Sequence, residues 1–400
     1  MARFSAQELF SPPIAKLNAS AIREICKLIS RPQLMSLAGG WPDPQTFPVE
    51  QITAIVSDVL RENAALALQY TSSEGLPELR QWLCEWMKRR DGIACGPEQV
   101  LVTHGSAQGM ELVAKALLSP GDVAIVGLPT YFGGPGACRS FGAELVGVPV
   151  DDNGMDTDAL EATLGRLREV GRRAKLVYVI PDFQNPTGAT MPVERRKRLV
   201  ELASEYDLVV VEDSPYRDLC YDGSPPPPVK SFDGEGRVMY LRSFSKIFCP
   251  GFRLGLAVGD ETLVRKMVIA RQFEDCCTAA FGQYVLFEFC KRGLLDRQIE
   301  SNIGFYRQKR DILLDALGRY FPRTVSWNRP SGGFFVWVRL REGLDAEELL
   351  RKSVSNDVAF VAGRPFFIDG SGSNTMRLSF AQEAPERMTE AVKRLSDLLW

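Results

Sequence analysis

The sequence predicts an α/β protein in which a mostly parallel β-sheet lies between helices and is followed by a smaller α+β region. Between about residues 100 and 260, short runs rich in Val, Ile and Leu alternate with longer amphipathic stretches. This alternation is typical of βαβ units and of a sheet covered on both faces. Beyond about residue 292 the pattern changes to a long helix, one alternating run and a final helix. At 400 residues, the chain also exceeds one ordinary domain of roughly 150 residues.

The expected elements follow in chain order. A first helix is predicted over residues 18–30, because Ile22, Cys26 and Ile29 recur at helical spacing and Asn18 can cap the helix. The expected elements of the sheet region are a helix at 105–118, a strand at 123–128, a helix at 157–170, a strand at 176–180, a helix at 192–206, and strands at 208–211 and 238–241. In the second region we expect a helix from about 292, a strand over 332–338 and a closing helix from about 384.

Charge and residue usage exclude several classes of protein. Lys and Arg number 48 against 50 Asp and Glu, so the net charge of −2 lacks the basic excess typical of nucleic-acid binding. A single histidine, His104, excludes a metal site built from several imidazoles, and the nine cysteines include no CxxC pair, so no metal is expected. The sequence shows no signal peptide and no apolar run of about 18 residues. We therefore expect a cytoplasmic protein that binds neither nucleic acid nor membranes.

Polar residues follow the predicted strands directly. They are Asn185 with Pro186-Thr187-Gly188, then Asp213 and Tyr216, then Ser243, Ser245, Lys246 and Arg253. Upstream, a glycine-rich turn that contains Ser106, Ala107 and Gln108 opens a helix. Ligands of an open parallel sheet bind beyond the carboxyl ends of its strands. We therefore expect these side chains to converge on one crevice.

Each of these residues has a plainer interpretation when it is taken alone. Asp213 and Ser106 are common helix-capping types, and Lys246 can be a solvated surface lysine. For His104, a packed or hydrogen-bonded neighbour is favoured over a catalytic group. The basic run at 195–198 is interpreted as a solvated helix face, because acidic residues flank it.

In this order and spacing the residues resemble the fold-type I, class I and II aminotransferases that use pyridoxal 5′-phosphate (PLP). The resemblance covers essentially the whole chain. Its most specific motifs are Asn185 to Gly188, Asp213 with Tyr216, Ser243 to Lys246 with Arg253, and Arg377 within Met376 to Phe380. Within the class, the chain is most similar to the 2-aminoadipate, kynurenine and aromatic aminotransferases, through residues 19–24, 36–40, 69–70 and 360–363.

This resemblance implies a PLP-dependent transaminase whose large domain holds a mostly parallel, seven-stranded sheet. The implied division is an N-terminal arm with part of the small domain at 1–48, the PLP-binding domain at 49–291 and a small C-terminal domain at 292–400. A PLP lyase or decarboxylase on the same fold stays open, because the motifs do not fix which bond at Cα reacts. A transcriptional regulator that fuses a DNA-binding domain to this module is disfavoured, because the pattern starts within the first twenty residues.

The resemblance also implies a role for each cofactor residue. Lys246 binds the cofactor aldehyde through its amine and, once displaced by an amino acid, moves a proton at the substrate Cα. Asp213 pairs with the pyridine nitrogen and keeps it protonated. Asn185 and Tyr216 hold the 3′ oxygen, while Tyr131 stacks on the ring. The implied phosphate ligands are Ser106, Ala107, Gln108, Ser243, Ser245, Arg253 and, from the neighbouring subunit of a homodimer with shared active sites, Tyr70.

The substrate residues are implied in the same way. Arg377 is expected to bind the α-carboxylate as a bidentate fork, assisted by Asn185 and by the backbone of Gly39 and Gly40. Arg23, on the predicted first helix, is either a solvated charge or the contact for a distal carboxylate.

The expected substrates are small-molecule amino acids and 2-oxo acids. The donor is predicted to be 2-aminoadipate or an aromatic amino acid, and the acceptor 2-oxoglutarate. Trp41 stands after Gly39-Gly40, where relatives tend to carry a smaller aliphatic residue. It therefore favours a flat or apolar second substrate.

Overall fold

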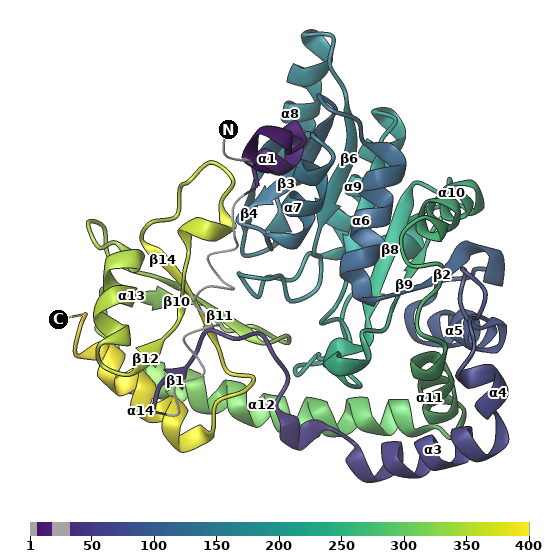
Figure 1. Ribbon diagram of the computed structural model, residues 1–400. Helices are drawn as coiled ribbons and strands as arrows, with labels where there is room; N and C mark the ends of the chain where they lie inside the picture. Colours follow the sequence, from purple (N-terminus) through teal and green to yellow (C-terminus); the bar gives the residue numbers. More distant parts are fainter. Residues whose placement is uncertain (1–5, 18–32, 400) are drawn as a thin grey trace, which may run out of the picture.

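The centre of the molecule is a mixed β-sheet with helices on both faces (Figure 1). The computed structural model describes residues 6–17 and 33–399. The strands, in chain order, are β2 (Val100–Thr103), β3 (Val123–Leu128), β4 (Glu144–Asp151), β5 (Gly154–Met155), β6 (Ala174–Val179), β7 (Val209–Asp213), β8 (Val238–Ser243) and β9 (Gly255–Val258). Seven of them form the expected sheet, and the two-residue β5 is added at its edge. The predicted fold class is therefore confirmed.

The strand order brings several carboxyl ends to one edge of this sheet. The order in space is β2-β9-β8-β7-β6-β3-β4-β5, and β8, β7, β6, β3 and β4 run parallel to one another. Strand β9 runs antiparallel to both of its neighbours. The direction in which the chain adds strands reverses between β3 and β6. Such a switch point opens a crevice at the carboxyl ends of the strands.

Two layers of helices cover the sheet, because the strands carry apolar side chains on both faces. One face packs against α6 (Gly105–Leu117), α7 (Gly133–Ser140) and α10 (Glu261–Gln272), and the other against α8 (Thr157–Glu169) and α9 (Val193–Glu205). Helix α6 approaches the sheet closely at Gly109, where a Cβ would lie 3.0 Å from the Leu241 side chain.

A second, four-stranded sheet has the order β10-β11-β14-β13. Its strands are β10 (Ser326–Trp327), β11 (Phe335–Arg339), β13 (Val361–Ala362) and β14 (Thr375–Ser379), and its helices are α12 (Leu294–Tyr320), α13 (Ala346–Val354) and α14 (Pro385–Ser396). Figure 1 shows α12 running from beneath the large sheet to this second sheet. Strand β1 (Met35–Ser36) pairs with β12 (Val358–Ala359), so the chain after residue 33 also joins this part.

The remaining helices frame the two sheets. They are α1 (Pro12–Ala15), α3 (Val49–Glu62), α4 (Ala64–Ala67), α5 (Pro77–Asp91) and α11 (Ala280–Lys291). Short 3₁₀ turns are η1 (Ala6–Leu9), η2 (Pro44–Thr46), η3 (Pro97–Gln99), η4 (Val229–Phe232), η5 (Phe244–Lys246), η6 (Pro250–Phe252) and η7 (Arg364–Phe366). Over residues 6–17 and 33–399, the structure contains no helix with the length and apolar character needed to cross a membrane.

The basic run at 195–198 departs from its prediction. Arg196 is completely buried, and its guanidinium donates to Asp182 Oδ1 at 2.7 Å, so the solvated-face interpretation is wrong for this residue. It shares a helix face with the buried Leu199 and Ala203, a spacing that the sequence already contains. The predicted helix at 18–30 lies outside the described residues.

Candidate functional site

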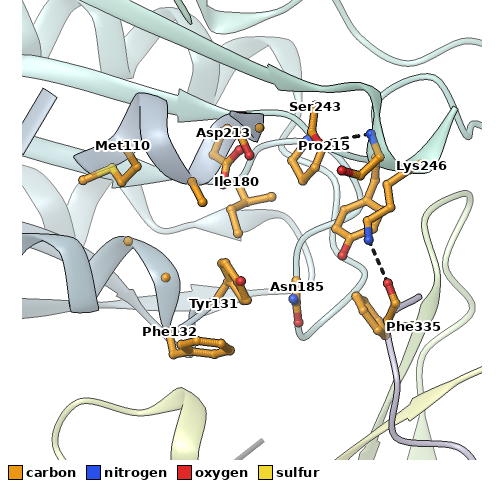
Figure 2. A pocket seen from close by; sticks show the side chains of 18 of the residues that line it. Met110, Tyr131, Phe132, Ile180, Asn185, Asp213, Pro215, Ser243, Lys246 and Phe335 are labelled. Carbon is orange, nitrogen blue, oxygen red and sulfur yellow. Dashed lines mark hydrogen bonds between the residues drawn. The ribbon is translucent and has the colours of Figure 1, made fainter. Parts of the chain in front are cut away.

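A cavity of about 580 Å³ opens at the carboxyl ends of the parallel strands, on the side that faces the second sheet. Most of the residues singled out from the sequence line it: Gly40, Ser106, Ala107, Tyr131, Asn185, Asp213, Tyr216, Ser243, Ser245, Lys246, Arg253 and Arg377. Figure 2 shows Asp213 and Lys246 facing this cavity from different sides, with Tyr131 and Asn185 below them.

Asp213 is the last residue of β7 and is buried, with 6% of its surface exposed. Its Oδ2 accepts a 2.8 Å hydrogen bond from the Tyr178 hydroxyl, whereas its Oδ1 is buried without a hydrogen-bond partner among the described residues. Burial raises the pKa of Asp213 to about 6, although the hydroxyls of Tyr178 and Ser106 act against this shift. The cavity therefore contains an unsatisfied carboxylate oxygen, which a cationic donor of a ligand can pair with.

Tyr178 is the polar residue of this wall that sequence reasoning missed. It lies inside β6, two residues before Ile180, and not after the strand. The search for polar groups beyond strand ends therefore passed over it. A phenol within the otherwise apolar run at 176–180 was the available signal.

Lys246 ends the turn η5 after β8, and its Nζ donates to the Gly40 carbonyl at 2.8 Å. Burial and, to a smaller extent, the nearby cations Arg253 and Arg377 lower the pKa of Lys246 to about 8. A larger fraction of this amine is therefore neutral near neutral pH than in an ordinary lysine, and a neutral amine can act as a nucleophile or a base.

One end of the cavity is shaped to bind an anion. Ser106 and Ala107 lie in the first turn of α6, whose free amide groups and dipole favour negative charge. Ser243 and Ser245 lie beside them, and the Arg253 guanidinium is 3.5 Å from the Ser245 hydroxyl.

Gly105 is needed where the glycine-rich turn enters this anion site. Its φ is +75°, and a Cβ there would lie 3.1 Å from the Arg253 guanidinium. The turn thus needs a residue without a side chain, both for its backbone conformation and for the close approach of Arg253.

A second cation lies on the side of the second sheet. Arg377, in β14, donates to Asn185 Oδ1 at 2.7 Å and to the Ala38 carbonyl at 2.6 Å. Its guanidinium lies over the Phe335 ring at 4.1 Å. This geometry fixes the plane of an arginine fork at the cavity wall, as binding of a carboxylate requires.

The rest of the lining is largely aromatic. The Tyr131 and Phe132 rings lie 4.6 Å apart, and the Tyr216 ring meets Phe335 edge to face at 5.6 Å. Burial raises the pKa of Tyr216, with Arg377 and Asn185 acting in the opposite direction. Trp41 also lines the cavity and keeps 44% of its surface exposed. The described walls thus offer flat apolar surfaces beside the two cationic ends.

Three of the predicted residues that the structure describes are not brought into this lining. Gln108 directs its side chain away, donating to Asp275 at 2.7 Å, and Gly39 lies only next to the lining. Tyr70 is 80% exposed on the surface. Arg23 lies outside the described residues.

His104 also lies beside the site without lining its cavity. Its Nε2 is 3.4 Å from Asp275 Oδ2, and burial lowers its pKa. Its backbone N–H donates to Gln108 Oε1 at 2.9 Å, so the structure places it as the packed or hydrogen-bonded neighbour expected from the sequence.

Comparison with known proteins gives consistent findings. The family model for aminotransferase class I and II matches residues 35–395. The chain is 44% identical over 393 residues to aromatic-amino-acid aminotransferase 1 of Thermococcus litoralis, covering 98% of this chain and 94% of that relative.

Two solved structures superpose over nearly the whole chain. One is Pyrococcus horikoshii kynurenine aminotransferase in complex with PMP, with a TM-score of 0.95 and 41% identity, covering 98% of this chain and 97% of that chain. The other is LysN, the α-aminoadipate aminotransferase of Thermus thermophilus, complexed with N-(5′-phosphopyridoxyl)-L-leucine. It has a TM-score of 0.91 and 39% identity, covering 99% of this chain and 98% of that chain.

Proposed function

Since the chain belongs to the class I and II aminotransferases and is a PLP-dependent transaminase, we propose that it transfers the amino group of an aromatic amino acid or 2-aminoadipate to 2-oxoglutarate. The observation that carries this proposal is the largely aromatic lining beside Arg377, in the same cavity as the Lys246 amine and the unsatisfied Oδ1 of Asp213. A carboxylate with one oxygen left without a hydrogen bond among the described residues suits a protonated ring nitrogen, and a buried amine suits an aldehyde.

The residues present fit PLP at both ends of the cavity. Bound PLP supplies an electron-withdrawing ring that stabilises negative charge at the substrate Cα. Asp213 would pair with the ring nitrogen, Asn185 and Tyr216 would hold the 3′ oxygen, and Tyr131 would cover the ring face. The phosphate would be held by the α6 backbone at Ser106, Ala107 and Gln108, by the side chains of Ser243, Ser245 and Arg253, and by Tyr70 of a second subunit.

Lys246 would hold and return the proton that moves during transfer. Its pKa of about 8 leaves the amine available as a base near neutral pH. Its Nζ is already held toward the cavity by the Gly40 carbonyl. Once an amino acid is bound, this amine would be the group that takes the proton from the substrate Cα.

Arg377 would bind the α-carboxylate, which donor and acceptor share. Its contacts with Asn185 and the Ala38 carbonyl orient the fork, and the Gly39-Gly40 backbone lies beside it. A Cβ at Gly40 would lie 2.7 Å from the Phe335 ring, so this approach depends on glycine.

The side chain of the donor would contact the aromatic walls. Among the described lining residues, the cations are Lys246, Arg253 and Arg377, and each has a role above. A distal carboxylate would therefore need Arg23, whereas an aromatic side chain can lie against Trp41. The described part of the cavity therefore favours aromatic donors. Binding of a dicarboxylic substrate would depend on Arg23 of the predicted first helix.

A homodimer with a shared site is part of the same proposal. Tyr70 is exposed next to Leu66 and Leu68, which are 61% and 70% exposed, and Phe273 is 86% exposed. A second subunit that receives Tyr70 would also cover the exposed side chains of Leu66 and Leu68. We further propose that the domains divide near residues 48 and 292, with the chain up to 48 shared between arm and small domain.

The experiment is a half-reaction panel. Enzyme loaded with PLP is mixed with phenylalanine, kynurenine, 2-aminoadipate, glutamate or lysine, and the cofactor absorbance is followed before and after 2-oxoglutarate is added. We expect aromatic donors and 2-aminoadipate to change the spectrum, and 2-oxoglutarate to restore it. Failure of all of these donors, or restoration only by another 2-oxo acid, would overturn the substrate assignment.

Arg23→Ala separates the two parts of the substrate proposal. Loss of a desolvated charge-assisted contact lowers kcat/KM for 2-aminoadipate and glutamate by about ten- to a hundredfold and leaves phenylalanine unchanged. An unchanged ratio of glutamate to phenylalanine activity would make Arg23 a surface charge.

A further inference from the structure

The hydroxyl of Tyr178 is directed at the carboxylate that faces the cavity. It donates to Asp213 Oδ2 at 2.8 Å, and both residues are buried, with 1% and 6% of their surface exposed. The second oxygen, Oδ1, is left without a hydrogen bond among the described residues. One oxygen of Asp213 is therefore fixed from within the sheet while the other remains for a ligand.

The sheet itself determines this contact. Tyr178 in β6 pairs in register with Val211 in β7, and Asp213 lies two residues further along the same strand. Side chains two residues apart point to the same face of a strand. Tyr178 therefore reaches Asp213 diagonally across one face, and its position depends on strand register rather than on a loop.

Helix α7 leaves room for the Tyr178 ring. Gly134 faces the ring, and a Cβ at Gly134 would lie 2.5 Å from its nearest carbon, closer than real Cβ atoms approach. The glycine at this position therefore allows the tyrosine ring to pack between strand and helix. The strand and the helix thus both restrict the Tyr178 ring, and this fixes the direction of its hydroxyl.

We propose that Tyr178 is a positioning residue for the cofactor, which holds Asp213 with Oδ1 turned toward the ring nitrogen and favours its ionised form. The inference rests on the proposed role of Asp213. The hydroxyl donates to a charged acceptor, and such a hydrogen bond is stronger than one between neutral groups. It also restricts rotation of the carboxylate, so less freedom is lost when the ring nitrogen binds.

The other groups around this pair leave Tyr178 as the main donor. The polar and titratable neighbours on the surrounding elements are Ser106 in α6, Tyr131 before α7 and Tyr216 after β7. The cations that line the same cavity are Lys246, Arg253 and Arg377. The groups that oppose the rise in the pKa of Asp213 are the hydroxyls of Tyr178 and, to a smaller extent, Ser106. The ionised carboxylate therefore depends more on these hydroxyls than on a neighbouring cation.

The test compares two cofactor analogues on two tyrosine variants. Tyr178→Phe keeps the ring that packs beside Gly134 and removes the hydroxyl. Tyr240→Phe is the matched control, because Tyr240 lies in β8, is fully buried, and has a hydroxyl without a hydrogen-bond partner among the described residues. The probes are pyridoxamine 5′-phosphate, which needs no bond to Lys246, and its carbocyclic analogue with CH in place of the ring nitrogen. Dissociation constants are measured by fluorescence titration of the cofactor-free protein between pH 5 and pH 8.

We expect Tyr178→Phe to weaken pyridoxamine 5′-phosphate about tenfold and to leave the carbocyclic analogue nearly unchanged. The acid limb of the binding profile should also move to higher pH. Loss of the hydroxyl lets Asp213 take up a proton at higher pH, and a neutral carboxyl cannot pair with a ring cation. Tyr240→Phe should match the wild type with both ligands.

Three outcomes separate the possible errors. Equal weakening of both analogues by Tyr178→Phe would make the tyrosine a structural residue and overturn the proposal, and the ratio of the two affinities is independent of the folded fraction. An effect of Tyr178→Phe that persists in an Asp213→Ala background would show that it does not act through Asp213, which also overturns it. Wild-type protein that binds neither analogue would instead contradict the proposed function.

Discussion

Two buried polar regions lie next to each other in the large sheet and differ in how completely their groups are paired. The ion-pair network consists of Asp91, Asp182, Arg196, Arg217, Asp218 and Arg242. Arg196 donates to Asp182 and to the carbonyls of Met191, Pro181 and Pro227. The neighbouring cavity holds Asp213 with one oxygen unpaired among the described residues. The Ser214 hydroxyl, 3.4 Å from Asp182 Oδ2, joins the two regions.

The pKa of a buried aspartate is therefore shifted in opposite directions in these two regions. Burial opposes ionisation of Asp182, but Arg196 and Arg217 outweigh it and lower the pKa of this carboxyl. Burial also acts on Asp213, where the hydroxyls beside it do not outweigh the effect, and it raises the pKa to about 6. A buried charge that is fully paired makes the structure around it rigid. A buried charge that is left unpaired destabilises the free protein, and a ligand that pairs with it removes this cost on binding. The network thus holds the loop after β7, and the cavity beside it stays ready to bind.

The largest effect is expected on the cavity side, at Lys246. Lys246→Ala should lower turnover by about 10⁴-fold or more, the upper end of what proton transfer by one side chain contributes. The unfolding temperature of the cofactor-free protein should not fall, because Lys246 belongs to no ion pair among those found in the described chain. Steady-state rates and thermal melts check both statements. Lys266→Ala, at an exposed position of α10, is the control.

Borohydride reduction of the holoenzyme gives an independent check of the same assignment. Peptide mass mapping should find the cofactor attached to Lys246. Attachment to another lysine would contradict the site.

On the network side, Arg196→Ala should lower the free energy of unfolding by about 3–5 kcal/mol. Its removal leaves Asp182 buried with Arg217 as its remaining cation, at 3.2 Å. Urea unfolding of the cofactor-free protein measures the change. A loss below about 1 kcal/mol would show that the network does not stabilise the fold.

Asp213→Asn should act in the opposite direction on the cofactor-free protein. The folded pKa of Asp213 lies above its unfolded value of 3.8, so the stability it contributes is present below pH 3.8 and lost as pH rises through about 6. The variant should therefore be more stable than wild type by about 1–3 kcal/mol at pH 7 and by less at pH 5. Turnover should fall, because an amide carries no charge to pair with a ring cation. A variant that is less stable at pH 7 would mean that Asp213 is paired.

The network should not change over that pH interval. The pKa values of Asp182 and Asp218 are lowered, so their contribution is present above about pH 3.8 and is lost only as pH falls further. Burial raises the pKa of Glu212 to about 7, but this residue is the same in both proteins. The difference between the melts of wild type and Asp213→Asn at pH 5, 6 and 7 therefore reports on Asp213.

The smallest effect is expected one residue before Arg196. Arg195 pairs with Asp151 at 2.6 Å, but the two side chains are 21% and 47% exposed. Arg195→Ala should cost about 1 kcal/mol or less, since solvent screens such a pair. Arg195→Ala and Arg196→Ala each remove an arginine–aspartate pair, one partly exposed and one buried. Equal losses of stability would show that burial does not cause the difference.

Prediction from the sequence succeeded for polar residues that directly follow a predicted strand. Asn185, Asp213 and Lys246 were assigned to one crevice because parallel strands deliver their carboxyl ends to the same edge, and the structure brings all three to one cavity. The order of the motifs also identified the family, which the comparisons confirm. The individual roles of these residues stay predictions.

Prediction failed where the answer depends on a neighbour from another part of the chain. Arg195 and Arg196 are adjacent in the same basic run, yet one is partly solvated and the other completely buried against Asp182. Tyr178 meets Asp213 because of the register between β6 and β7. Tyr70 lies on the surface of the described chain, and its predicted role needs a second subunit.

The sequence by itself determined the fold class, the family, and the edge of the sheet at which the chemistry gathers. These follow from hydrophobic periodicity and from residues close in the chain, whose relative positions are set by local geometry. The tertiary structure alone decided which buried charges are paired and which oxygen of Asp213 is left open. Pairing depends on distances of a few ångströms between residues far apart in sequence, and only packing and strand register determine those distances.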